Sequence, residues 1–296
     1  MKTLIEILRL SQSYLAEHGV SGARRNAELL LCHVLGLDRL GLYLNHERPL
    51  TEPELDRCRA LLKRRGAHEP LQYITGRTQF RHLELYTGPG VLIPRPETEM
   101  LADLALEWLQ KKAGGNAASP LPRVLDLCCG SGAVGLSLAL EHPEAEYTLS
   151  DISQVALGWA VKNSRMLLSG NVKVTFCLCD LLSAFREMPL FDLVVANPPY
   201  VSPDEMLSLP DEIRLFEPVS ALDGGGEDGT GLINMLVAQA VPRLRNGGLL
   251  ALETGENQHS ALERIFSGYA GKLAAVKFHR DLSGRERFVT ACRLND

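Results

Sequence analysis

The sequence lacks the features that mark membrane proteins and basic nucleic-acid binders. No stretch of its 296 residues approaches the roughly 18 uncharged apolar residues that a membrane-spanning helix needs, so we expect no membrane partner. The net charge is −5, whereas a protein that holds duplex DNA or RNA by its phosphates usually carries a basic excess. We therefore expect no direct binding of nucleic acid.

A metal-binding or disulfide framework is also absent from the sequence. The seven cysteines are odd in number, and neither Cys128 with Cys129 nor Cys177 with Cys179 has the two-residue spacing of a zinc site or redox motif. The eight histidines are scattered, without a pair at metal-ligand spacing. We predict reduced, buried thiols in a cytoplasmic protein that binds no metal.

The chain length fits two domains, because domains usually run to about 100–200 residues. Apolar side chains recur at helical spacing in the first part, and Thr51 followed by Glu54 is typical of a capping box at a helix start. We predict a small helical bundle domain over residues 1–75. Residues 76–96 contain several glycines and no helical period, which predicts a hairpin linker. The second domain is then 97–296.

The second domain alternates short apolar runs with helical segments. Continuous apolar strands separated by helices are typical of an α/β fold whose parallel sheet is covered on both faces. We predict a doubly wound, mostly parallel, Rossmann-like sheet of seven strands. The predicted strands are 124–129, 147–152, 172–178, 191–196, 249–253, 273–278 and 288–293. The predicted helices are 97–112, 133–140, 154–168, 232–244 and 261–266, with a surface loop over 114–122.

A glycine-rich loop follows the first predicted strand of this sheet. The run from Asp126 to Gly135 reads D-L-C-C-G-S-G-A-V-G and contains the G-x-G-x-x-G pattern, and Asp151 lies about 20 residues further on. Strand, turn, helix and downstream acid all stand in register, which favours a bound ligand over a plain glycine turn. Taken alone, the pattern also fits a dinucleotide-dependent oxidoreductase.

The acids around this loop favour S-adenosylmethionine over a dinucleotide. Asp126 stands four residues before the first glycine, where a carboxylate would repel a pyrophosphate but suit a ligand with an ammonium group. We predict that Asp151 accepts from the ribose hydroxyls. Asp180, at the end of the third predicted strand, is placed to reach the adenine edge, although an ordinary loop aspartate explains it nearly as well.

The motif Asn197-Pro198-Pro199-Tyr200 follows the strand predicted at 191–196. Proline fixes its own φ, lacks an N–H and keeps the preceding residue extended. The Asn197 side chain and the Pro198 carbonyl can therefore be held rigidly as two acceptors for the hydrogens of one –NH₂ group. Tyr200 offers a flat face against which a planar amide or base can stack. A plain proline turn would not explain why the motif coincides with a cofactor loop in the same sheet.

This motif suits methyl transfer to a planar nitrogen. An amide nitrogen shares its lone pair with the carbonyl and is a poor nucleophile, so accepting its two protons and holding it in line with the methyl group both assist transfer. The predicted catalytic residues are Asn197, Pro198 and Tyr200, and the predicted substrate-binding residues are Asn197, Pro198, Pro199 and Tyr200. The predicted cofactor-binding residues are Asp126, Gly130, Ser131, Gly132, Asp151, Asp180 and Asn197.

With both motifs in hand, the sequence resembles the release factor glutamine methyltransferases, the HemK or PrmC family. Four further segments carry the resemblance: E-P-L-Q-Y-I-T-G at 69–76, P-G-V-L-I-P-R-P-E-T-E at 89–99, L-E-T-G-E-N-Q at 252–258 and D-L-S-G-R-E-R at 281–287. The resemblance implies methylation of the glutamine side-chain amide in the Gly-Gly-Gln loop of class I peptide chain release factors. It implies S-adenosylmethionine as methyl donor, S-adenosylhomocysteine as product and a release factor as partner of a monomeric enzyme.

The motifs leave other substrates and roles open. Amino-methyltransferases of DNA and RNA bases share Asn-Pro-Pro-Tyr, so an adenine or guanine amino group in nucleic acid is the alternative substrate. A noncatalytic protein that senses S-adenosylmethionine also fits the glycine loop. The chain departs from the family at Cys128 and Cys129, where Gly-Thr or Gly-Cys is usual.

Charged residues near the motifs are open to more than one interpretation. Arg95, Glu97 and Glu99 either close over the cofactor or, for the two acids, stabilise the first turn of a helix. Asp223 and the glycines after it form either a loop near the active site or a plain turn.

Overall fold

The computed structural model divides into two compact units, and each is described by itself. It describes residues 2–113, 120–168, 170, 172–188 and 190–294. One unit comprises Met1–Arg77 and Pro210–Phe216, and the other comprises Thr78–Leu209 and Glu217–Asp296.

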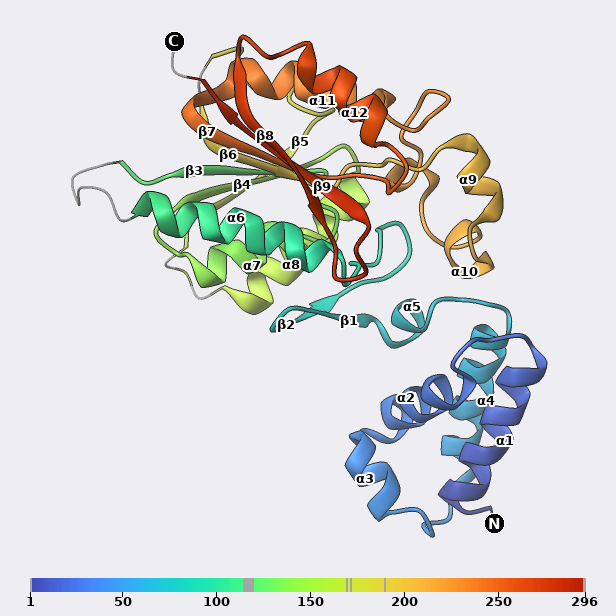
Figure 1. The fold of residues 1–296 in the computed structure, drawn as a ribbon. Coiled ribbons are helices and arrows are strands. Elements are labelled where there is room, and N and C mark those ends of the chain that lie inside the picture. Colours follow the sequence, from blue (N-terminus) through green and yellow to red (C-terminus); the bar gives the residue numbers. More distant parts are fainter. Residues whose placement is uncertain (1, 114–119, 169, 171, 189, 295–296) are drawn as a thin grey trace. The chain divides into compact units, whose positions relative to one another are not determined.

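The first unit is a bundle of short helices, as the sequence predicts (Figure 1). Its helices are α1 (Leu4–Glu17), α2 (Ala23–Leu35), α3 (Arg39–Leu44), α4 (Glu52–Gly66), α5 (Leu71–Thr75) and α10 (Asp211–Arg214). The predicted capping box of Thr51 and Glu54 starts α4, and Gly36 ends α2 in the left-handed conformation at φ 66°. Leucines on the inner faces of α1 and α2 form the core of the bundle.

The segment Pro210–Phe216 belongs to this unit, which no sequence pattern indicates. Buried Arg65 on α4 donates to Glu212 at 2.6 Å, to Asn26 at 2.8 Å and to the Glu69 carbonyl at 3.0 Å. A buried guanidinium needs such partners, because burying an unpaired charge is costly. These bonds therefore tie a distant part of the chain to the helical bundle.

The predicted linker forms a hairpin of β1 (Arg77–Phe80) and β2 (Leu83–Tyr86). The hairpin end is fixed by Asn163, a fully buried residue of α8 (Gln154–Leu167). Its side chain accepts from the Tyr86 N–H at 2.7 Å and donates to the Tyr86 carbonyl at 3.0 Å. It also donates to the Ser131 carbonyl at 2.9 Å, so the same amide supports the glycine loop.

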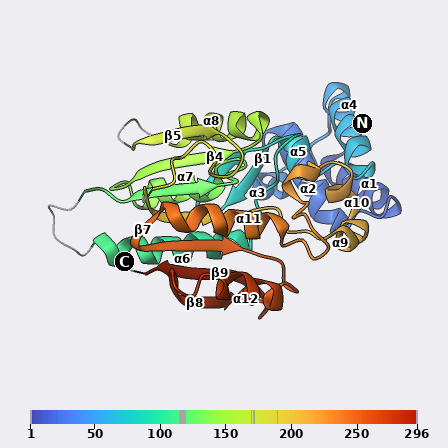
Figure 2. The same ribbon diagram turned by 90° about the horizontal axis from the view of Figure 1, so that it is seen from above.

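The second unit is built on a seven-stranded sheet in the order β5-β4-β3-β6-β7-β9-β8. Its strands are β3 (Arg123–Leu127), β4 (Glu146–Asp151), β5 (Val174–Leu178), β6 (Phe191–Ala196), β7 (Leu244–Glu253), β8 (Leu273–Arg280) and β9 (Glu286–Arg293). Figure 2 shows β5 near one edge and β8 near the other. The pairs among β3 to β7 are parallel, and β9 runs antiparallel to both neighbours, so the predicted mostly parallel sheet is confirmed.

Helices cover both faces of the sheet (Figure 1). One face carries α6 (Thr98–Ala113), α7 (Ala133–Glu141) and α8, and the other carries α11 (Gly231–Ala240) and α12 (His259–Ser267). The short helices α9 (Pro203–Ser208), η1 (Val219–Ala221) and η2 (Val241–Arg243) complete the elements of this unit among the described residues.

Two predicted boundaries were wrong for local reasons. The helix predicted over 232–244 ends at Ala240, because Pro242 lacks an N–H and cannot continue it. The strand predicted to reach Cys129 ends at Leu127, because Cys128 takes the left-handed conformation at φ 56°. The helices α9 and α10 were not predicted. Residues 114–119 of the predicted loop lie outside the described residues.

Candidate active site

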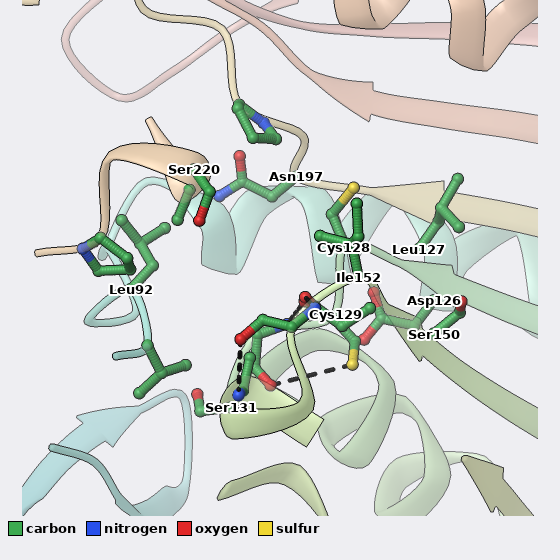
Figure 3. A pocket seen from close by; sticks show the side chains of 18 of the residues that line it. Leu92, Asp126, Leu127, Cys128, Cys129, Ser131, Ser150, Ile152, Asn197 and Ser220 are labelled. Carbon is green, nitrogen blue, oxygen red and sulfur yellow. Dashed lines mark hydrogen bonds between the residues drawn. The ribbon is translucent and has the colours of Figure 1, made fainter. Parts of the chain in front are cut away.

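A cavity of about 250 Å³ lies beyond the carboxyl ends of β3, β4 and β6. The strand order changes direction at β3, and open α/β sheets bind their ligands at such switch points. Of the residues predicted to bind cofactor or substrate, the wall contains Asp126, Gly130, Ser131, Asp151, Asp180, Asn197 and Pro199. Figure 3 shows Asn197 across the cavity from Ser131. Gly132, Pro198 and Tyr200 are chain neighbours of these residues and do not line it themselves.

The glycine loop turns sharply between β3 and α7. Gly130 and Gly132 take positive φ values of 55° and 83°, which favour glycine. A Cβ on Gly132 would also lie 2.9 Å from Leu136. Gly132 therefore shapes the turn from behind, while Gly130 and Ser131 face the cavity. The Ser131 hydroxyl is buried and has no hydrogen-bond partner among the described residues.

Asp126 is buried at the end of β3, in the wall of the cavity. Its Oδ2 accepts from the Gly135 N–H at 2.8 Å, and a Cβ on Gly135 would lie 2.8 Å from the same oxygen. Only glycine thus lets the helix approach this carboxyl group. Burial raises the pKa of Asp126 to about 7, since a charge is poorly solvated there.

Asp151 joins the end of β4 to the glycine loop. One carboxylate oxygen accepts from the Gly130 N–H and the other from the Ser153 N–H, each at 2.8 Å. Burial raises the pKa of Asp151 above its ordinary value. Asp180 also lines the cavity, but its side chain is exposed after β5.

The Asn-Pro-Pro-Tyr motif is connected to two residues that the sequence analysis did not select. Asn197 Nδ2 donates to Thr98 Oγ1 at 3.1 Å, and Thr98 Oγ1 donates to Glu253 Oε2 at 2.6 Å. Tyr200 Oη donates to the other carboxylate oxygen of Glu253 at 3.1 Å. The four side chains form one hydrogen-bonded group, drawn from α6, β7 and the segment after β6.

The backbone of the motif is held by the loop around Asp223. Val201 N–H donates to the Leu222 carbonyl at 2.8 Å, and Gly224 N–H donates to the Val201 carbonyl at 3.1 Å. A Cβ on Gly224 would lie 2.7 Å from the Tyr200 Cα, so the close approach requires glycine. Asp223 lines the cavity, and the interpretation as a loop near the site is therefore correct.

Arg95, Glu97 and Glu99 do not line the cavity. Arg95 pairs with buried Glu217 at 2.6 Å, and the other oxygen of Glu217 accepts from the Ile93 N–H at 3.1 Å. Glu99 lies in the first turn of α6 and accepts from the Arg81 N–H at 2.8 Å. Glu97 is exposed. The position of Glu99 fits the helix-turn interpretation, whereas the ion pair of Arg95 with Glu217 was not predicted from the sequence.

Thr98 and Glu253 were missed because no local pattern marks them as functional. Both lie within segments that carry the family resemblance, P-R-P-E-T-E and L-E-T-G-E-N-Q. A buried acid at the carboxyl end of β7, the strand beside β6, was the available signal.

No group of three or more His, Cys, Asp or Glu residues is arranged to hold a metal ion in the described part of the chain. None of the described helices is both long and apolar enough to cross a membrane.

Two family models match the chain. The model described as the PrmC N-terminal domain matches residues 6–76, and that described as the methyltransferase small domain matches residues 99–217. Among solved structures, a methyltransferase from Pyrococcus furiosus is similar with a TM-score of 0.49 and 16% identity, covering 72% of this chain and 90% of that one.

Curated relatives match nearly the whole chain. The release factor glutamine methyltransferase of Geobacter sulfurreducens is 38% identical, covering 97% of this chain and 95% of that protein. The enzyme of the same name from Thermodesulfovibrio yellowstonii is 36% identical, with coverages of 90% and 91%. The one from Chlorobaculum tepidum is 39% identical over 85% of each chain.

Proposed function

The chain belongs to the release factor glutamine methyltransferase family, and we propose that its site methylates a glutamine side-chain amide in a class I peptide chain release factor. The methyl donor is S-adenosylmethionine. The observation that carries the proposal is that Asn197 stands in the wall of the same cavity that the glycine loop lines. The names of the relatives supply the substrate class, and none of those cited favours the alternative of an amino group in nucleic acid.

The residues of the cavity fit S-adenosylmethionine. The buried Ser131 hydroxyl lacks a hydrogen-bond partner among the described residues, as expected for a group that hydrogen-bonds to a polar ligand. Asp126 would face the ammonium group, Asp151 the ribose hydroxyls and Asp180 the adenine edge. The turn of Gly130 and Gly132 brings backbone close to the ligand. When bound, S-adenosylmethionine supplies an electrophilic methyl group on a sulfonium.

The motif after β6 would hold the glutamine amide. Asn197 Oδ1 and the Pro198 carbonyl accept the two amide hydrogens, and Tyr200 limits the plane of the amide. Accepting both hydrogens increases electron density on the nitrogen, and fixing its position replaces a random encounter with an oriented one. No strong base is required at the start, because the sulfonium loses its positive charge as the methyl group leaves.

The test uses labelled S-adenosylmethionine with a purified class I release factor. We expect the label on the factor with the native Gly-Gly-Gln loop and none on its Gly-Gly-Ala variant. Equal labelling of the two factors would contradict the glutamine assignment. A parallel reaction with total RNA and DNA tests the alternative substrate, and label there without label on the factor would replace the proposal.

A further inference from the structure

The hydrogen-bonded group of Glu253, Thr98, Asn197 and Tyr200 has a defined donor–acceptor direction. We propose that Glu253 and Thr98 are positioning residues that fix which end of the Asn197 amide faces the substrate. The inference rests on the proposed function, because it concerns the acceptor that Asn197 offers to the glutamine amide. Neither residue needs to touch the substrate for this role.

The direction begins at Glu253, which is buried at the end of β7. An ionised carboxylate can only accept hydrogen bonds, and its two oxygens accept from Thr98 Oγ1 at 2.6 Å and from Tyr200 Oη at 3.1 Å. A threonine hydroxyl has a single proton. Once Thr98 donates that proton to Glu253, its oxygen can only accept from other groups.

The accepting oxygen of Thr98 then selects the orientation of Asn197. Only the –NH₂ end of the asparagine amide can donate, so Nδ2 faces Thr98 at 3.1 Å and Oδ1 faces away from it. A substrate –NH₂ group needs an acceptor, which is Oδ1. With the amide reversed, the –NH₂ group of Asn197 would meet the –NH₂ group of the substrate, and no hydrogen bond would form between them. The carboxylate thus determines, through one hydroxyl, that Asn197 offers an acceptor to the –NH₂ group of the substrate.

The charged and titratable groups around Glu253 bear on its ionisation. Arg287 of β9 stabilises the carboxylate, whereas Glu97, just before α6, and the burial of the site oppose it. Burial dominates and raises the pKa of Glu253 to about 7. A protonated Glu253 can donate to Thr98, whose own proton is then released toward Asn197 and favours the reversed amide. The correct orientation is therefore retained above pH 7 and lost as the pH falls below it.

The experiment compares Thr98→Val with Thr98→Ser in the full-length enzyme at saturating S-adenosylmethionine. Valine keeps the shape of threonine and removes the hydroxyl, so single-turnover methyl transfer to a release factor should fall by about 10²-fold, as for loss of one positioned polar group. Serine keeps the hydroxyl and should restore most of the rate. Calorimetric affinity for S-adenosylmethionine should stay the same in both variants, which separates a positioning effect from a folding defect.

A second readout reports the orientation itself. A release factor with Gly-Gly-Glu in place of Gly-Gly-Gln presents only acceptors, so it should inhibit the wild-type enzyme poorly. Thr98→Val should narrow the difference in affinity between the two factors, because the Asn197 amide can then turn either end to the ligand. A general distortion of the site would weaken the binding of both release factors by the same factor, and this result would overturn the inference.

The pH profile supplies the test for Glu253. At saturating S-adenosylmethionine the wild-type single-turnover rate should fall on the acid side of a midpoint near pH 7, and Glu253→Gln, which cannot ionise, should lose this limb. The same limb in Glu253→Gln, or a wild-type rate in Thr98→Val, would overturn the inference while the proposed function stands. If the wild-type enzyme labels no release factor, the proposed function and the inference fail together.

Discussion

At the scale of single residues, two buried acids of the second unit, Asp126 and Glu253, have pKa values raised to about 7 but lie in different parts of the site. Asp126 lies in the part of the cavity assigned to the cofactor, whereas Glu253 lies behind Thr98 and Tyr200. Burial raises both values, because each carboxylate loses water that the protein only partly replaces. The two groups should therefore titrate in the same pH range but affect different steps of the reaction.

The affinity for S-adenosylmethionine should depend on pH through Asp126. A bound ammonium group stabilises the carboxylate and lowers its pKa, so binding releases a proton when Asp126 starts protonated. Because the pKa in the free protein is raised to about 7, affinity should fall by up to about tenfold for each pH unit below that value. Calorimetry from pH 5.5 to about 8 measures this slope. The Asp126→Asn variant should bind S-adenosylmethionine weakly, with an affinity that does not change with pH. The control variant Glu253→Gln should keep the pH dependence of the affinity. If Asp126→Asn kept that pH dependence, Asp126 would not be the group that meets the ammonium.

The backbone conformation of Cys128 should lower the stability of the fold by a measurable amount. Cys128 takes φ 56°, where a side chain is strained. Cys128→Gly should stabilise the fold by about 0.5–1 kcal/mol. Glycine removes the strain energy of a side chain in the left-handed conformation, and this gain exceeds the extra entropy that the more flexible unfolded chain loses on folding. Urea denaturation checks the sign. Cys129→Gly is the matched control and should destabilise, because Cys129 is buried and has no positive φ.

At the scale of elements, the position of the reactive motif depends on a glycine loop as much as on its own prolines. A Cβ on Gly224 would lie 2.0 Å from the Gly229 carbonyl oxygen and 2.7 Å from the Tyr200 Cα. Both contacts are with backbone, which cannot rotate away. Gly224→Ala should therefore displace Tyr200, lower the transfer rate at least about tenfold and destabilise the fold by about 1–3 kcal/mol.

Gly225→Ala is the control for this substitution. Its φ of 70° makes alanine strained there, but a Cβ would meet no atom within 4 Å. It should lose about 1 kcal/mol of stability and keep the transfer rate. Single-turnover rates and denaturation curves of both variants separate strain from displacement of the motif. Equal rates in the two variants would show that the Gly224 contact does not position the site.

Local sequence patterns predict the order of the elements but not all contacts between them. Strand and helix order follows from local patterns, since buried parallel strands are continuous apolar runs and α7 starts at a glycine turn. The Asn-Pro-Pro-Tyr motif is equally local. Thr98 and Glu253 lie 155 positions apart and meet only because the sheet places β7 beside β6 and α6 packs against them. Short α9 and α10 were missed because their few residues carry no apolar period.

At the scale of the whole molecule, the groups assigned to cofactor and amide all lie in the second unit. One glutamine side chain offers little binding area, whereas specific protein complexes bury about 1,200–2,000 Å². We therefore expect the first unit to recognise the release factor. The chain enters this unit again at Pro210–Phe216, shortly after the Asn-Pro-Pro-Tyr motif.

The return of Pro210–Phe216 dictates how the role of the first unit must be tested. Deleting residues 2–76 alone would leave Glu212 without Arg65, so the truncated protein should also carry a Gly-Ser linker in place of 210–216. The matched control is the full-length chain with the same linker, which isolates any effect of that segment.

The truncated protein should bind S-adenosylmethionine as the control does, because the cavity lies within the second unit. It should methylate the intact factor at least about 10²-fold less efficiently, the loss expected when an interface of several kcal/mol disappears. A short Gly-Gly-Gln peptide uses only the cavity and should lose little. A truncated protein that methylates the intact factor as well as the control would assign recognition to the second unit instead.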